Sequence, residues 1–252
     1  MAVQTYKFGT GSLYAAKTGP GAGPFTPIGF GALQDVSVAF EGTIKPLHGQ
    51  QIYPLANALA QGKVTGKASW AQVNGQAYND LFFNGTLTSG SGISVAVNEA
   101  ATVPAATPWT VVVVNGALFS EDLGVKYLNG GNPLTKVTGT PTAAGQYAVN
   151  ATTGTYTFDT ADASALVVIS YTYTNTVGMT IKMTNQLQGA APTFAIWFAT
   201  TYNGQQAMFK LMACSASKLS MPSKMADWNI DEIDFQGQAD ASGNIAEISL
   251  LT

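Results

Sequence analysis

The residues most often used in catalysis and metal binding are scarce in this chain, which has one histidine, His48, and one cysteine, Cys214. A catalytic triad needs an acid that orients its histidine, but no Asp or Glu lies close to His48 and no G-x-S-x-G motif is present. One histidine and one cysteine cannot complete a tetrahedral zinc site. We therefore interpret His48 as a loop or interface residue and Cys214 as a buried structural thiol.

Three carboxylates cluster near the C-terminal end at Asp231, Glu232 and Asp234. Paired carboxylates can perform glycosidase chemistry or hold calcium. On a regular strand, however, the adjacent Asp231 and Glu232 point to opposite faces, and no D-x-D-x-D-G calcium loop is present. The apolar positions change phase between Ile230 and Ile233, as a β-bulge would cause. We favour a solvated acidic strand, with a calcium site or a catalytic pair as the alternatives.

Residues 19–24 read GPGAGP, a glycine-rich segment that invites comparison with phosphate-binding loops. The segment lacks the G-x-x-x-x-G-K-[ST] pattern, and its two prolines have no N–H group to donate. We expect an extended loop here. Because no pattern assembles a catalytic, cofactor or metal site, the sequence predicts a protein that is not an enzyme and uses no cofactor.

The composition excludes several further classes of protein. Charged residues make up 10% of the chain, against roughly 25% in an ordinary soluble domain. All eleven basic residues are lysine and the net charge is −3, so a nucleic-acid-reading surface is not expected. The longest apolar runs, at 111–114 and 165–170, fall far short of the ~20 residues that cross a bilayer, and residues 1–10 contain no signal-peptide core. So low a proportion of charged residues indicates that other subunits cover much of the surface.

Alternation of polar and apolar residues predicts that most of the chain forms short strands. In residues 35–43, the apolar Val36, Val38 and Phe40 alternate with Asp35, Ser37, Ala39 and Glu41, so we expect these three apolar side chains to pack inside the subunit. The turn residues at 240–243 predict that the last two strands form a hairpin. The further strands are expected at 63–72, 179–183, 194–200, 207–213, 228–235 and 245–250.

One segment has helical spacing instead of alternation. Residues 73–85 predict a helix of about ten residues, with Asn74 as its N-cap and Asn84-Gly85 as its stop. Residues 54–61 suggest one further short helical turn.

Residues 90–176 differ from the rest of the chain in their charge and in the spacing of their predicted strands. They contain five acids and two lysines, for a net charge of −3, and short predicted strands separated by turns. The sequence therefore predicts an all-β module of 87 residues inserted into a larger, mainly β domain formed by residues 1–89 and 177–252.

The flanking parts show an order of elements that resembles the major tail tube proteins of long-tailed bacteriophages. The resemblance covers about 1–89 and 177–252 and depends on the arrangement of strands, helix and acidic C-terminal segment, not on a short motif. The inserted module looks like small β modules of phage virion proteins. The segments that carry the resemblance are YKFGTGSLY (6–14), PIGFGALQDVSVAFE (27–41), LHGQQIYP (47–54), GKVTGKASW (62–70), LFF (81–83), LMACSASKL (211–219), KMADW (224–228) and FQGQADASGNI (235–245), with GTYTFDTAD (154–162) and ISYTY (169–173) in the insert.

The resemblance implies a β-sandwich or barrel-like tail tube fold with one flanking α-helix, carrying an inserted all-β module of immunoglobulin-like size. It implies a structural virion protein that forms homohexameric rings, which stack as a hollow tail tube through which DNA passes as cargo. The implied partners are further copies, the tape measure and the tail terminator, without membrane insertion, in a virion tail assembled in the bacterial cytoplasm. A capsid-decorating or host-adhesion protein of a phage is the alternative.

Within that hypothesis, two groups of residues are candidates for function. The polar face of residues 35–43 is the candidate lining of the channel, and two loops are candidate contacts between stacked rings. The inserted module is expected on the outer surface, because it would obstruct the channel. The candidate lumen residues are Asp35, Ser37, Glu41 and Thr43, and the candidate stacking residues are Gly19, Gly21, Gly23, Lys45, His48 and Gln50.

Overall fold

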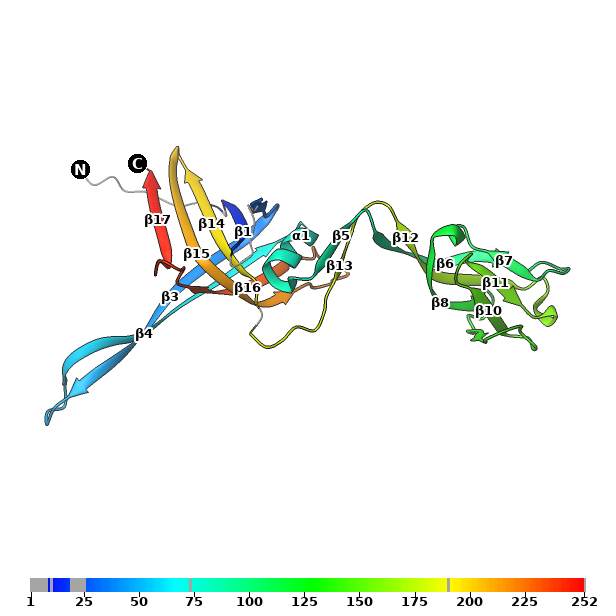
Figure 1. Cartoon of the computed structure of the whole chain (residues 1–252), viewed down its shortest axis with the longest axis horizontal. Helices are drawn as coiled ribbons and strands as arrows, with labels where there is room; N and C mark the ends of the chain where they lie inside the picture. The colour runs from blue at the N-terminus through cyan, green and yellow to red at the C-terminus, as the bar shows by residue number, and fades with distance from the viewer. Residues whose placement is uncertain (1–8, 10, 19–25, 73, 190, 252) are drawn as a thin grey trace. The chain divides into compact units, whose positions relative to one another are not determined.

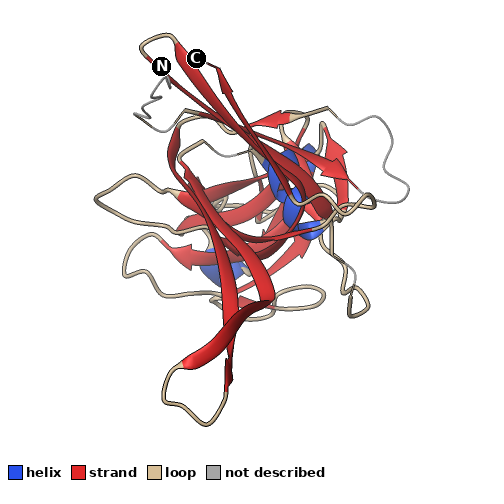
Figure 2. Cartoon of the chain, turned by 90° about the vertical axis from the view of Figure 1, so that its left-hand side faces the viewer, coloured by secondary structure: helices blue, strands red, loops and turns tan. Residues whose placement is uncertain are grey.

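The computed structural model describes residues 9, 11–18, 26–72, 74–189 and 191–251. The chain divides into two compact units: unit 1 comprises Met1–Leu87 and Ile181–Thr252, and unit 2 comprises Thr88–Thr180 (Figure 1). The sequence placed the limits of the insert at 90 and 176. The strands β5 (Thr86–Ser89) and β13 (Met179–Lys182), which lead into and out of unit 2, pair with each other. Strands predominate and helix is confined to short segments, so the predicted mainly β class is confirmed (Figure 2).

Unit 1 is built on one antiparallel sheet in the order β2-β1-β14-β15-β16-β4-β3, with β17 also paired to β15. The predicted strands 35–43, 194–200 and 207–213 lie within strands of this sheet. The predicted strand 63–72 ends two residues later than the observed one, which stops at Trp70. Its strands are β1 (Ser12–Thr18), β2 (Ile28–Gly29), β3 (Leu33–His48), β4 (Pro54–Trp70), β14 (Thr193–Tyr202), β15 (Gln205–Ser220), β16 (Asp231–Gln238) and β17 (Ala246–Leu251).

The last two strands do not form the predicted hairpin. Both β16 and β17 pair antiparallel with β15, β16 along Ala213–Ser220 and β17 along Gln206–Leu211, so β17 continues the line of β16. The expected turn at 240–243 is present, because the Asp240 carboxylate accepts hydrogen bonds from the Ser242 and Asn244 backbone N–H groups. The turn therefore carries the chain from β16 to β17 along the same edge of β15, without reversing the direction of the chain.

The predicted helix is present but is only partly α-helical. It consists of α1 (Gly75–Tyr78) followed by a π-helical turn, η1 (Asn79–Phe83). Asn74 is the N-cap as expected, since its side chain accepts from the Gln76 and Ala77 N–H groups. Asn84, in the left-handed conformation at φ 48°, ends the helical segment.

The chain between residues 42 and 62 is a two-stranded ribbon, not the loop and helical turn that the sequence suggested. Strand β3 continues to His48 and β4 begins at Pro54, so only residues 49–53 form the turn. Strand β16 pairs with β4 only between Val64 and Trp70. Beyond that point, within the part of the chain that the structure describes, β3 and β4 pair only with each other and extend away from the rest of the sheet (Figure 1).

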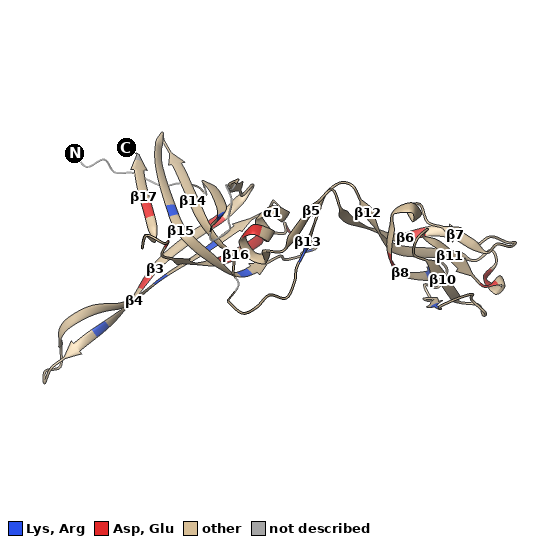
Figure 3. Cartoon of the chain, viewed as in Figure 1, with Lys and Arg blue, Asp and Glu red and all other residues tan. Residues whose placement is uncertain are grey.

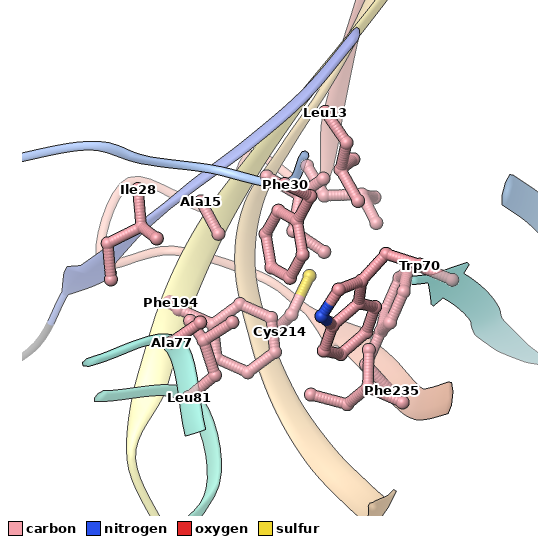
Figure 4. Close-up of a cluster of buried hydrophobic side chains, with 14 of the residues drawn as sticks. Leu13, Ala15, Ile28, Phe30, Trp70, Ala77, Leu81, Phe194, Cys214 and Phe235 are labelled. Carbon is pink, nitrogen blue, oxygen red and sulfur yellow. The ribbon is translucent and has the colours of Figure 1, made fainter. Parts of the chain in front are cut away.

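The core of unit 1 lies between the sheet and the helical segment (Figure 4). Trp70 and Phe235 are each 1% exposed, and the Phe30 ring meets Trp70 edge-on with centroids 4.8 Å apart. Leu81 from the helical segment packs into the same cluster. Cys214 is fully buried there, as expected, and burial raises the pKa of its thiol to about 12.

Unit 2 is an all-β module of two small sheets around its own core. One sheet has the order β6-β12-β8 and the other β7-β11-β10-β9. Val167, Ile169 and Tyr171 alternate inward from β12 and are each fully buried. The strands are β6 (Gly92–Thr102), β7 (Thr110–Val112), β8 (Phe119–Tyr127), β9 (Thr135–Lys136), β10 (Gln146–Asn150), β11 (Thr155–Phe158) and β12 (Leu166–Asn175), with 3-10 turns η2 (Gly116–Leu118) and η3 (Thr160–Asp162).

A buried carboxylate ties the two sheets of unit 2 together. The Asp122 side chain is 3% exposed and accepts hydrogen bonds from the hydroxyls of Tyr147 at 2.8 Å and Tyr156 at 2.9 Å. It also accepts from the Gly124 N–H at 3.0 Å and forms an ion pair with Lys136 at 3.0 Å. Burial on its own would raise the pKa of Asp122, but these donors outweigh it and lower that pKa below its ordinary value.

No helix among the described residues is long and apolar enough to cross a membrane.

Candidate functional site

One face of the sheet of unit 1 is polar, and we call it the polar face. Directly opposed residues of an antiparallel sheet point to the same side, so the register defines this face row by row. One row runs from Asp35 through Ser69 to Glu232, and the next from Ser37 through Lys67 to Asp234. The helical segment packs on the opposite face. Further rows and the adjoining part of β15 add Glu41, Thr43, Gln61, Lys63, Thr65, Gln236 and Lys218.

Lysines and acids both occur along the strands of unit 1 (Figure 3). On the polar face each lysine lies beside an acid. Lys67 pairs with Glu232 at 2.6 Å, and Lys218 lies 3.5 Å from Glu232 and 3.9 Å from Asp234. The hydrogen bond between Lys67 and Glu232 raises the pKa of Lys67 and lowers that of Glu232. Exposed pairs contribute little to stability. Their main effect here is to cancel charge across the face.

The polar face has a net charge close to zero. Its four acids are Asp35, Glu41, Glu232 and Asp234, and its three lysines are Lys63, Lys67 and Lys218, for a net charge of −1. A surface with mixed charge and no arginine offers phosphate few strong contacts, because bidentate recognition of phosphate depends on arginine.

The structure brings the candidate lumen residues together on this face. Asp35, Ser37, Glu41 and Thr43 are all exposed and project from β3 on the same side. One part of the expectation for this strand is wrong, because Phe40 is 57% exposed. Its strand extends past the core, and the ring meets that of Phe209 edge-on, with centroids 5.9 Å apart.

The candidate stacking residues fall in three different places. Lys45 and His48 lie on strand β3, not in a loop, and Gln50 lies in the turn; all three are exposed. The strand persists because β3 and β4 remain in register, with Lys45 opposite Ala58 and His48 opposite Pro54. The three glycines Gly19, Gly21 and Gly23 lie outside the described residues.

The ribbon, defined as residues 42–62, exposes large apolar side chains that the sequence analysis did not single out. Ile52 is 91% exposed and Tyr53 is 81% exposed at its turn. Ile44 and Leu59 lie opposite each other across the ribbon. The signal in the sequence was the absence of charged residues between His48 and Lys63, in a segment that contains several large apolar residues. The exposed set is Ile44, Leu47, Ile52, Tyr53, Leu55 and Leu59, each at 63% or more.

An apolar groove lies near the base of the ribbon and was also missed by the sequence analysis. It has a volume of about 390 Å³. Its walls come from β3, β14, β15 and β17, which are distant in sequence, so local patterns contain no trace of it. The groove is lined by Gly9, Val36, Val38, Phe40, Phe198, Thr200, Ala207, Met208, Phe209 and Ile248.

The acidic strand separates its carboxylates as alternation predicted. Asp231 is 7% exposed and accepts a hydrogen bond from the Tyr78 hydroxyl, whereas Glu232 faces the polar side. Burial and the Asp231 carboxylate raise the pKa of Tyr78. The predicted bulge is absent from β16, since Trp228 and Ile230 precede the strand. Among the residues that the structure describes, no cluster of His, Cys, Asp and Glu is suited to a metal ion.

A scan against models of known protein families finds no match, and a search of curated proteins finds none with significant similarity.

Proposed function

We propose that this chain is a structural subunit of a phage tail, which assembles into hexameric rings stacked as a hollow tube through which DNA passes. In this proposal its partners are further copies of itself, with the tape measure and terminator proteins of the tail. Its role is architectural, not catalytic. The observation that carries the proposal is the exposed apolar ribbon.

The ribbon has the properties of a surface that another subunit covers. An isolated two-stranded ribbon is marginally stable in water, and residues 42–62 pair with no third strand among the described residues. Covering one of its large apolar side chains would contribute about 1.5–3 kcal/mol. Exposed apolar surface of this extent is typical of an interaction site. The ribbon therefore supports self-association.

The ribbon and the apolar groove are different surfaces of one unit. A contact between unlike surfaces of identical subunits is heterologous, and it produces closed rings or open filaments according to the rotation between neighbours. Within the described residues, β2, β3 and β17 each pair with only one strand, so the sheet has edges at which neighbouring sheets can join. These features favour rings and stacks over a closed dimer.

The polar face suits the wall of a channel for DNA. A wall that holds phosphate through cationic contacts would slow the transit of DNA. Here each lysine of the face lies near an acid, and the face sums to −1. We assign Asp35, Ser37, Glu41 and Thr43 to that wall as part of the proposal.

Electron microscopy of the purified protein tests the proposal. We expect hexameric rings or hollow tubes in the wild type, and their loss when Ile52→Lys and Tyr53→Lys place charges on the ribbon. Gln51→Lys with Asn57→Lys is the matched control, because it adds the same two charges at exposed positions of the ribbon without removing an apolar side chain. Tubes that form equally well with both apolar residues replaced would exclude the ribbon as the assembly contact. Compact trimers in the wild type would favour the decorating or adhesion alternative.

A further inference from the structure

Strand β6 forms an edge of the three-stranded sheet in unit 2. It spans Gly92–Thr102 and pairs with β12 alone. Every residue of unit 2 is described, so its other edge is unpaired within the described chain. An unpaired edge of this length presents a row of backbone donors and acceptors that another strand can use.

The side chains of β6 favour pairing of this edge with another strand. Ile93, Val95 and Val97 point to the outer side of the sheet and are 58%, 54% and 70% exposed. The one charged residue of the strand, Glu99, accepts hydrogen bonds from the Tyr171 hydroxyl at 2.6 Å and the Val114 N–H at 2.9 Å. Lysine and proline, which commonly protect exposed edges, are absent from the strand.

We propose that β6 pairs antiparallel with β6 of a second copy of the chain, with Val95 on the two-fold axis. Antiparallel pairing of two identical strands is two-fold symmetric, so both copies use the same surface. With Val95 opposite Val95 of the second copy, Ile93 lies opposite Val97 and Val97 opposite Ile93. This register places all three exposed apolar residues in cross-strand pairs, which stabilise a sheet when directly opposed.

The bulge in β6 limits the extent of this contact. The register against β12 shifts between Ile169 and Tyr171, and Asn98 adopts a left-handed conformation at φ 54°. Regular pairing with β12 therefore ends at Ala96, and Val97 and Asn98 together lie opposite Ser170. Val97 is still exposed on the outer side, so we expect the edge to pair as far as residue 97. With Val95 on the axis, residues 93–97 of each copy pair. Five residues a side bury less than the roughly 1,000 Å² of a stable interface, so we expect a weak, reversible dimer.

This contact does not depend on the proposed tube, because it uses residues of unit 2 alone. The subunits of the proposed tube all point the same way along its axis, so the stacking of rings does not itself create a two-fold contact. In a sample that assembles, the pairing would therefore join separate rings or tubes side by side.

Single cysteines in the full-length chain test the register. Val95→Cys should give a disulfide-linked dimer under mild oxidation, because opposed Cα atoms lie about 4.5–5.5 Å apart. Ile93→Cys alone and Val97→Cys alone should give at least tenfold less dimer, whereas an equimolar mixture of these two should restore it. The wild type measures the background, since Cys214 is buried. Equal yields at all three positions, or no dimer at position 95, would overturn the proposal.

A charge exchange separates specific pairing from a change in folding. Val95→Lys in both partners of the cysteine mixture should abolish the cross-link through like-charge repulsion on the axis. Val95→Lys in one partner and Val95→Glu in the other should restore it. Failure to restore the cross-link would also overturn the proposal. Tubes are scored by microscopy in the same samples, so tubes without cross-links reject only the pairing, and cross-links without rings or tubes reject only the proposed function.

Discussion

The buried carboxylate of unit 2 should control the stability of that unit and its dependence on pH. Asp122→Asn preserves the shape of the side chain but removes its charge. The four groups that donate to Asp122 then lose a charged acceptor. Hydrogen bonds to a charged group contribute about 1.5–3 kcal/mol and neutral ones about 0.5–1.5 kcal/mol. Because the effects within one network are not additive, we expect the free energy of unfolding of unit 2 to fall by about 2–4 kcal/mol.

Lysine at position 136 provides the matched control. Its side chain is 52% exposed whereas that of Asp122 is 3% exposed. Lys136→Met removes the same ion pair but leaves both tyrosine hydroxyls and the Gly124 N–H on the carboxylate. Because three donors still satisfy the Asp122 carboxylate in this variant, we expect it to lose less stability than Asp122→Asn.

The sign of the pH effect follows from the lowered pKa of Asp122 in the folded protein. In the unfolded chain the pKa of an aspartate is about 3.9. The stabilisation is therefore complete above that pH and is lost as the pH falls through the lower pKa of the folded state. Asp122→Asn should remove this part of the acid sensitivity, because the asparagine side chain does not titrate.

Hydrogen exchange measured by mass spectrometry in increasing urea resolves the two units, which need not unfold together. Peptides of β8, β10 and β11 report on unit 2, and peptides of β14 and β15 serve as the internal reference. An Asp122→Asn variant that retains wild-type stability within about 0.5 kcal/mol would refute the reasoning, since a surface substitution has an effect of that size. An unchanged acid transition would refute the pH argument.

Three further predictions concern unit 1 and the insert. Tyr78→Phe leaves its partner Asp231 buried without that donor, so urea denaturation of unit 1 should show a loss of about 1–3 kcal/mol; no loss would mean that water replaces the hydroxyl. Asp35→Lys with Glu41→Lys should leave tubes intact but reduce DNA delivery in an infection assay, because attraction to phosphate replaces repulsion; normal infectivity would count against a lumenal position. Replacing residues 88–180 with a short Gly/Ser linker should leave unit 1 able to form tubes that look thinner in micrographs, whereas an insoluble or monomeric product would place the insert in the wall.

Much of the local structure of this chain could be predicted from alternation and capping. Val64, Ala68 and Trp70 share the buried face of β4, and Asn74 caps the helical segment. Asp231 and Glu232 point to opposite faces because adjacent residues of a strand always do. These features depend on neighbours in sequence, so the residue types and their spacing were sufficient. The polar side chains of β3 were found in the same way.

Only the tertiary structure shows which strands pair, and which groove and hydrogen-bond network their pairing produces. The turn at Asp240 was correctly predicted, yet β17 pairs with β15, because the first half of that long strand offers a free edge beside the end of β16. The apolar groove and the donors around Asp122 join residues far apart in the chain. The length of the ribbon likewise follows from where β16 stops pairing with β4. Such contacts depend on the choice among many long-range pairings, and local propensity carries no information about that choice.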